Sequence, residues 1–270
     1  MSEPTSTISS CCIKTFCNEE ILMQLQNLSR AGQKLLLFSL SRLSHPGNTY
    51  IDRSVRITFS DYCSLIQHPY NDQISHGLVR KAFYDIKYNC EKIINSDSVY
   101  SELSKEVIIV FKHGFIDTLT TSDHVALPAN LFISSKRDKM PNIPLALAIY
   151  SKSKKTKNRT KTVSISVRDI IHILGGKFND YSNPPKNWRT VYVKRISSTF
   201  MTFKHTGLIK SYCFNLDGKT GFDLYNCNDD PHDGTDITNS IIQNVANDLT
   251  YEMMTKYYRI YMDVSVVITI

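Results

Sequence analysis

Six of the ten residues from 152 to 161 are lysine or arginine, and no acidic residue follows them until Asp169. Ammonium and guanidinium groups bind phosphate oxygens, and a run of them without a periodic apolar side is typical of a loop. We therefore expect this loop to contact the phosphates of a polyanion without reading its sequence. The side chains assigned to that contact are Lys154, Lys155, Lys157, Arg159 and Lys161.

A second group of cations lies on a helix that the apolar spacing predicts within residues 187–209. One face of this helix is apolar, and the opposite face combines lysine, arginine, serine and threonine without an acid. Such a face suits phosphates and base edges, whereas solvent-exposed faces usually mix acids with bases. The predicted core residues are Tyr192, Ile196, Phe200 and Phe203. The predicted contact residues are Arg189, Thr190, Lys194, Arg195, Ser198 and Thr202.

The net charge of +7 is concentrated in one part of the chain. Residues 1–132 carry 12 basic and 13 acidic side chains (net −1), residues 133–210 carry 17 and 3 (net +14), and residues 211–270 carry 3 and 9 (net −6). A concentrated positive segment indicates a polyanionic partner, with nucleic acid first and anionic lipid second.

The composition is that of a globular protein, with 41% hydrophobic and 21% charged residues in a chain of 270. The sequence has no apolar run as long as a membrane span and no signal peptide, so we expect a cytoplasmic protein without a membrane partner. Seven cysteines, an odd number without paired spacing, indicate free thiols instead of a disulfide framework or a zinc site.

No motif predicts catalysis. The tripeptide GKT at residues 218–220 lacks the upstream glycine of a Walker A loop, because Cys213 stands at that position. The acidic segment 228–236 lacks the spacing and the closing glutamate of an EF-hand. The eight histidines are dispersed, and no glycine pattern of a nucleophile elbow is present. We therefore expect a protein that is not an enzyme and that uses no metal or cofactor.

The first half of the chain is expected to run helix, strand, helix, helix and two-stranded ribbon. The ranges are one or two helices in 19–43, a strand at 54–60 with Ser60 capping a short helix, a helix at 75–93, and ribbon strands at 91–96 and 106–115. In the helix at 75–93 the residues expected to share the buried face are Val79, Ala82, Phe83, Ile86 and Cys90. The residues expected to contact DNA from the other side are Arg80, Lys81 and Tyr84.

The second half repeats this order. It is predicted as an extended lead-in at 124–134, helices at 142–155, 167–176 and 187–209, a strand at 162–166, and a hairpin at 210–225 around an Asp-Gly turn. The repeat predicts an α+β protein with two tandem winged helix-turn-helix domains. The expected divisions are a flexible segment at 1–18, a first domain at 19–122 for dimerisation, DNA binding or both, and a main DNA-binding domain at 123–270.

Two parts of the sequence resemble a known family. Residues 27–43 (NLSRAGQKLLLFSLSRL) and 55–66 (VRITFSDYCSLI) resemble the opening of plasmid replication initiators built from two tandem winged helices. Residues 127–132, 142–175 and 187–212 are similar to the second module of such initiators, with an aliphatic helix, an I-S-V strand, a short leucine helix and a basic helix. The pattern covers most of residues 25–225.

The resemblance implies sequence-specific binding to double-stranded DNA repeats at an origin, opening of the duplex, recruitment of host replication proteins, and a monomer–dimer equilibrium. It implies no enzyme activity. By position, the helices at 76–89 and 189–205 would be the two recognition helices. Asp85 beside Lys81 and Tyr84, and the net charge of −1 in that half, favour weak DNA binding or dimerisation by the first module.

Three other functions stay open. A transcription regulator could have the same fold, a nucleic-acid-processing enzyme could use a site without a sequence motif, and a scaffold protein could bring the basic segment to lipid or to an acidic protein.

Overall fold

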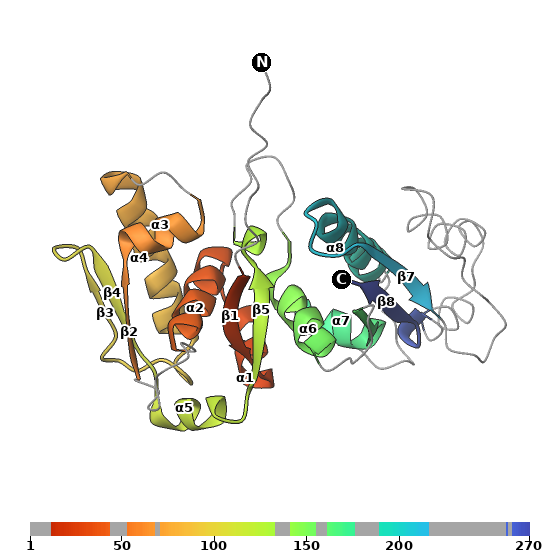
Figure 1. Ribbon diagram of the computed structural model, residues 1–270, viewed down its shortest axis with the longest axis horizontal. Helices are drawn as coiled ribbons and strands as arrows, with labels where there is room; N and C mark the ends of the chain where they lie inside the picture. Colours follow the sequence, from red (N-terminus) through yellow and green to blue (C-terminus); the bar gives the residue numbers. More distant parts are fainter. Residues whose placement is uncertain are drawn as a thin grey trace, which may run out of the picture. The chain divides into compact units, whose positions relative to one another are not determined.

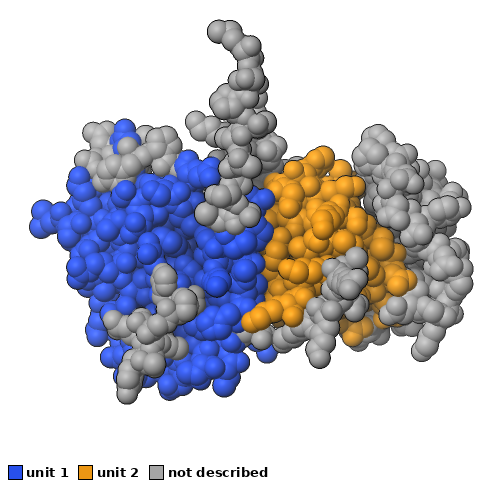
Figure 2. Space-filling view, viewed as in Figure 1, with its two compact units in different colours: residues 1–136 blue, residues 137–270 orange. Residues whose placement is uncertain are grey.

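The computed structural model describes residues 12–43, 53–67, 71–132, 141–154, 161–175, 189–215, 258 and 261–270. The chain divides into two compact units, residues 1–136 and 137–270 (Figure 2). This division lies later than the predicted boundary at residue 122. The reason is that the strand β5 (Asp123–Pro128), which the sequence assigned to the second domain, pairs with a strand of the first unit.

The partner of β5 is β1 (Cys12–Cys17), which runs antiparallel to it with Cys12 opposite Pro128. The expectation of a flexible segment at 1–18 is therefore wrong for residues 12–17. The second half of β1 is buried, and the Thr15 hydroxyl donates to the carbonyl of Leu37 at 3.5 Å. The strand was missed because its pairing partner lies more than a hundred positions away in the sequence.

Two helices follow β1, namely α1 (Glu19–Gln26) and α2 (Arg30–Leu43). The side chain of Asn18 caps α1 by accepting a hydrogen bond from the Ile21 amide at 2.8 Å, and acidic residues in the first turn favour the positive end of the helix dipole. The leucines of α2 form the centre of the core of this unit, and those with no exposed surface are Leu35, Leu36, Leu37 and Leu40.

The same succession of elements occurs in both units (Figure 1). In the first unit α2 is followed by β2 (Ser54–Thr58), α3 (Phe59–Leu65), α4 (Asp72–Asn89), β3 (Val99–Ser101) and β4 (Glu106–Val110). In the second unit α6 (Ile143–Lys154) is followed by β6 (Thr162–Ser166), α7 (Val167–Ile173), α8 (Lys194–His205), β7 (Ser211–Asn215) and β8 (Ser265–Thr269). The two sheets have the orders β2-β4-β3 and β6-β8-β7, so in each the last strand lies in the middle.

The junction between the strand and the short helix is built in the same way in both units. The hydroxyl of Thr58, the last residue of β2, accepts from the amide of Asp61 at 3.0 Å. The hydroxyl of Ser166, the last residue of β6, accepts from the amide of Asp169 at 3.0 Å. The predicted cap at Ser60 is therefore wrong, because a capping residue must have an extended backbone and Ser60 already lies inside α3.

The ribbon of the first unit differs from the prediction in two places. Residues 91–93 form a turn, and Ile94 makes only an isolated bridge with Phe111, so the expected strand at 91–96 is absent and β3 lies at 99–101. Ile93 and Ile94 are buried, which shows that their apolar character reflects core packing without strand pairing. After β4 the chain enters α5 (His113–Leu119), where the sequence predicted a continuing strand.

In the second unit the first two turns of α6 are buried on all sides, since every residue from Ile143 to Ile149 is buried. Strand β8 was not predicted, and it pairs antiparallel with both β6 and β7. The first strand of the predicted hairpin is β7, whereas the Asp-Gly turn and the second strand lie outside the described residues. The remaining described elements are the 3₁₀ turn η1 (Ala129–Leu131) and the π-helical turn η2 (Arg189–Val193).

Helices α2 and α4 are joined by the carboxylate of Asp85. One oxygen accepts from the backbone amide of Ser29 at 2.8 Å and from the Ser29 hydroxyl, and the other accepts from Asn89 at 2.8 Å. Ser29 immediately precedes α2, so an acid on α4 satisfies an amide at the start of a neighbouring helix. A Cβ at Gly32 would overlap this carboxylate, which explains a glycine in the first turn of α2.

Two glycine substitutions test this contact. Gly32→Ala should lower the free energy of unfolding by about 1–3 kcal/mol, because the methyl group displaces the Asp85 carboxylate. Gly77→Ala in α4 is the control: nothing lies within 4 Å of its Cβ position, so alanine should raise stability by about 0.5–1 kcal/mol. Chemical denaturation measures both, and equal effects would contradict the role of Asp85.

Lys34 of α2 is only 3% exposed. Burial, followed by the charge of Arg30, lowers the pKa of Lys34 from its ordinary 10.5 to about 8. Between these values the unfolded chain binds more protons, so the free energy of unfolding should rise from about pH 8 towards pH 10.5. Lys34→Met should flatten this rise, whereas Lys92→Met, at an exposed position, should leave it unchanged. Denaturation at a series of pH values checks the difference.

Candidate nucleic-acid interface

Helix α8 has one apolar side and one exposed basic side. Phe200 stacks on Tyr212 of β7, with ring centroids 5.2 Å apart, and this packing fixes the rotation of the helix about its axis. The buried residues include the predicted Ile196, Phe200 and Phe203. The exposed residues are Lys194, Arg195, Met201, Lys204 and His205, with Ser198 and Thr199 half-buried between them. Met201 and Lys204 were not among the predicted contact residues, although a helical wheel drawn from Lys194 would include Met201.

Three hydroxyl groups of α8 donate hydrogen bonds to carbonyls of the same helix, whereas the buried hydroxyl of Ser197 has no hydrogen-bond partner. Ser198 and Thr199 both donate to the carbonyl of Arg195, at 3.0 and 2.7 Å, and Thr202 donates to the carbonyl of Ser198 at 2.8 Å. A hydroxyl bound in this way keeps its lone pairs and can still accept a hydrogen bond, for example from an amino group of a base. Thr202 is only 9% exposed, so burial removes it from the predicted contact surface.

Arg195 combines exposure with a structural contact. Its guanidinium donates to the carbonyl of Leu174 at 2.6 Å, and Leu174 is the residue that ends α7. A helix C-terminus has unsatisfied carbonyls and a partial negative charge, so this bond ties α7 to α8. Arg195 was predicted only as a contact residue, and local spacing gave no sign of a partner 21 positions away.

The acids of the second unit do not compete for this surface, as far as the described residues go. Asp169 pairs with Lys152 at 3.5 Å, and Asp263 pairs with Arg168 at 3.7 Å. These are the two acidic residues of the unit within the described ranges. The exposed side of α8 therefore keeps the positive charge that its sequence predicts.

The lysine-rich loop is described only at its ends. Lys154, the last residue of α6, and Lys161, which precedes β6, are both exposed. The predicted contact residues Lys155, Lys157 and Arg159 lie outside the described residues, as do the side chains of Arg189 and Thr190 in η2.

Helix α4 presents a different surface, in which cations lie beside aromatic rings. Arg80 lies over the ring of Tyr84 at 5.9 Å, and Tyr84 stacks on Tyr88 at 5.8 Å with the ring planes 16° apart. Arg80 and Lys81 are exposed, as is Tyr88 at 66%. The predicted buried face is confirmed, since Val79, Ala82, Phe83 and Ile86 of α4 are buried, as is Cys90 directly after the helix. Tyr88 was left out of the predicted site, although its i+4 spacing from Tyr84 is the signal for such a pair.

Asp85 does not have the role that its neighbours suggested. The sequence treated it as an acid that would repel DNA from α4. Its carboxylate accepts hydrogen bonds from Ser29 and Asn89 instead, so it belongs to the packing of α4 on α2.

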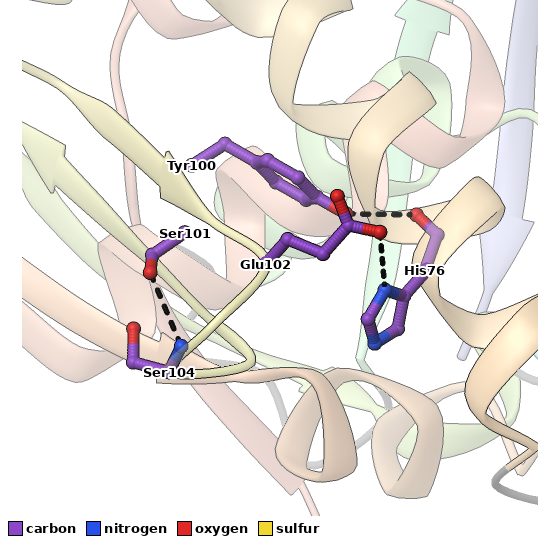
Figure 3. A network of polar contacts seen from close by, with 5 residues as sticks. All are labelled: His76, Tyr100, Ser101, Glu102 and Ser104. Carbon is purple, nitrogen blue, oxygen red and sulfur yellow. Dashed lines mark hydrogen bonds and ion pairs between the residues drawn. The ribbon is translucent and has the colours of Figure 1, made fainter.

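The ribbon of the first unit is held against α4 by polar contacts (Figure 3). The carboxylate of Glu102 lies 3.2 Å from Nδ1 of His76, and the Tyr100 hydroxyl donates to the His76 carbonyl at 3.5 Å. Nearer the base of the ribbon, the Lys87 ammonium donates to the carbonyl of Ser98 at 2.9 Å. The ribbon therefore runs alongside α4, with its turn next to the N-terminal half of the helix.

No protein-family model and no curated protein sequence matches the chain. A search of solved structures finds the crystal structure of the Pi initiator protein in complex with iteron DNA, at 13% sequence identity and a TM-score of 0.53. The alignment covers 77% of this chain and 92% of that one. The chain has the fold of the Pi initiator. The resemblance to initiators that the sequence predicted is thus confirmed at the level of the fold, across both units. No described helix is long and apolar enough to cross a membrane.

Two neighbouring cations of α8 should respond differently to truncation. Arg195→Ala removes a charged hydrogen bond to Leu174 and should lower the free energy of unfolding by about 1–3 kcal/mol. Lys194→Ala, at the adjacent exposed position, should change it by less than about 0.5 kcal/mol. Denaturation of the two variants side by side measures this. An unchanged stability for Arg195→Ala would contradict the structural contact.

Proposed function

We propose that this chain is a DNA-binding protein of two tandem winged helix-turn-helix units that initiates replication of a plasmid or similar element by binding repeated sites at its origin. The observation that supports the proposal most directly is the likeness across both units to an initiator crystallised on iteron DNA. The proposal includes a monomer–dimer equilibrium and contacts with host replication proteins.

The architecture of each unit supports the winged-helix part of this proposal. A short helix and a long helix follow one strand, and a two-stranded ribbon follows the long helix. The third strand pairs between the other two. The ribbon contacts the long helix in both units, since Tyr100 donates to the His76 carbonyl in the first and Tyr212 stacks on Phe200 in the second. In helix-turn-helix proteins the second helix enters the major groove, and by this analogy we propose α4 and α8 as the two recognition helices.

The chemistry of the two helices supports a division between them. The exposed side of α8 offers lysines and half-buried hydroxyl acceptors, which suit phosphates and base edges. The exposed side of α4 offers Arg80 and Lys81 beside stacked tyrosines. We therefore propose α8 as the main source of affinity and α4 as a second contact on the same duplex.

The test compares double variants that each remove two positive charges. Lys194→Ala with Lys204→Ala should weaken binding to duplex DNA more than Arg80→Ala with Lys81→Ala. Lys92→Ala with Lys112→Ala is the control, because both lysines are exposed but lie on neither helix. The probe is a duplex recovered by the wild-type chain from a random-sequence library, and fluorescence anisotropy gives Kd. A protein that neutralises about 6–10 phosphates should lose roughly 10³–10⁵ in affinity between about 50 and 200 mM salt.

Several outcomes would contradict the proposal. DNA binding that does not depend on salt would contradict the role of α8. So would a control variant (Lys92→Ala with Lys112→Ala) that loses as much affinity as Lys194→Ala with Lys204→Ala. A plasmid carrying the DNA that flanks the gene should be maintained only when the protein is supplied. Maintenance without it would favour the transcription regulator. The expectation that the protein is not an enzyme would fail if the pure chain cut the same duplex in the presence of a divalent metal.

A further inference from the structure

The turn of the ribbon between β3 and β4 exposes an apolar side chain at its tip. Leu103 is 99% exposed, the highest value among the large hydrophobic side chains that the structure describes. Leucines are usually buried, and a fully exposed one at the end of a hairpin contributes nothing to the core. Its neighbours Ser104 and Lys105 are exposed as well, so the tip projects as a small apolar point on a polar hairpin.

The turn around Leu103 is firmly held. The amide of Ser104 donates to the Ser101 hydroxyl at 3.2 Å (Figure 3). The carbonyl of Lys105 accepts from the amide of Phe59, at the start of α3, at 2.9 Å. Glu102 is fixed to His76 of α4. These three contacts, to α3, to α4 and within the hairpin, hold the tip on both sides. A tip held in this way can keep its position when it is pressed against a bound molecule.

The turn carries an acid and a cation beside Leu103. The Glu102 carboxylate lies 3.2 Å from the His76 ring, Glu106 at the start of β4 pairs with Arg56 at 3.5 Å, and Lys105 is exposed. Lys105 has a φ of +51°, a conformation that glycine or asparagine adopts more easily. A lysine at this position keeps a cation at the tip in spite of the backbone cost.

The position of the tip is set by α4. Because Glu102 and Tyr100 contact His76, the turn lies beside the N-terminal half of the helix, on whose exposed side Arg80 lies. A segment beside a helix in the major groove can reach the adjacent minor groove, as the N-terminal arm of homeodomains does. Proteins that enter the minor groove often insert leucine, methionine or phenylalanine between base steps, which unstacks and kinks the duplex.

We propose that Leu103 is an apolar wedge that enters the minor groove beside α4 and unstacks one base step of the bound duplex. This rests on the proposed function and adds a mechanical step to it. The cations of α8 and α4 provide the favourable free energy of binding. Part of this free energy offsets the cost of unstacking the DNA at Leu103. Within the complex, one base step of the duplex is therefore unstacked, whereas it is stacked in the free DNA.

The experiment uses the full chain and the duplex recovered by in vitro selection, with 2-aminopurine replacing single adenines. Unstacking of a base raises the fluorescence of 2-aminopurine. Wild-type protein should raise it at one step, and Leu103→Ala should reduce the rise at least about threefold while Kd changes by less than about tenfold. Leu103→Met should restore the rise, because methionine is also an apolar wedge. Met23→Ala on α1, at another exposed apolar position, is the control and should keep the full rise.

The outcomes separate the wedge from its alternatives. If the wild-type chain selects no duplex, the proposed function itself fails. If it binds a duplex without a rise at any step, or if Leu103→Ala keeps the full rise, the wedge is overturned. A Leu103→Ala variant that loses self-association in sedimentation, with base stacking as in wild type, would assign the tip to a protein contact and also overturn it. The side chain is exposed, so the melting temperature should stay unchanged in all Leu103 variants.

Discussion

In each unit an aromatic contact between the long helix and the strand that follows it sets the orientation of the whole exposed surface. Phe83 of α4 lies against Tyr100 of β3, with ring centroids 6.1 Å apart, and Phe200 of α8 stacks on Tyr212 of β7 at 5.2 Å. Aromatic pairs have preferred geometries and large buried areas, so they resist rotation of the helix about its axis. With the phenylalanines packed on the ribbons, cations of the two helices are left exposed, namely Arg80 and Lys81 of α4 and Lys194 and Lys204 of α8. The same device therefore orients two helices whose exposed chemistry is different.

Local pattern was sufficient to predict the long helices and their buried faces. The spacing of Val79, Phe83 and Ile86 predicted the inner side of α4, and the repeat of element order predicted the second unit. These features depend on neighbours within a turn or two of helix, which the sequence displays directly. The strands β1 and β8 were missed for the opposite reason. Each is defined by partners far away in the chain, and a short apolar segment does not show whether it pairs or only packs.

The candidate site was predicted in part, and the errors have a common origin. Arg195 and Asp85 were interpreted by charge alone, yet each makes a hydrogen bond to a residue in another element, Leu174 and Ser29. Thr202 was placed on the outer face, but it borders the buried stripe and bonds back to its own helix. A helical wheel gives the direction of a side chain but does not show which residue of another element the side chain contacts. Cations and hydroxyls at the edge of a predicted surface are therefore the residues whose roles most need a structure.

The central position of β8 has a consequence for how the protein is made. Strands β6 and β7 do not pair with each other in the sheet, and each pairs with residues 265–269. The paired strands described for the first unit lie within residues 12–128, so a ribosome adds them long before it reaches β8. The second sheet can close only after residue 269 has been added, because β8 is its central strand. A message or nascent chain that stops early would thus yield a folded first unit attached to an unfinished second one.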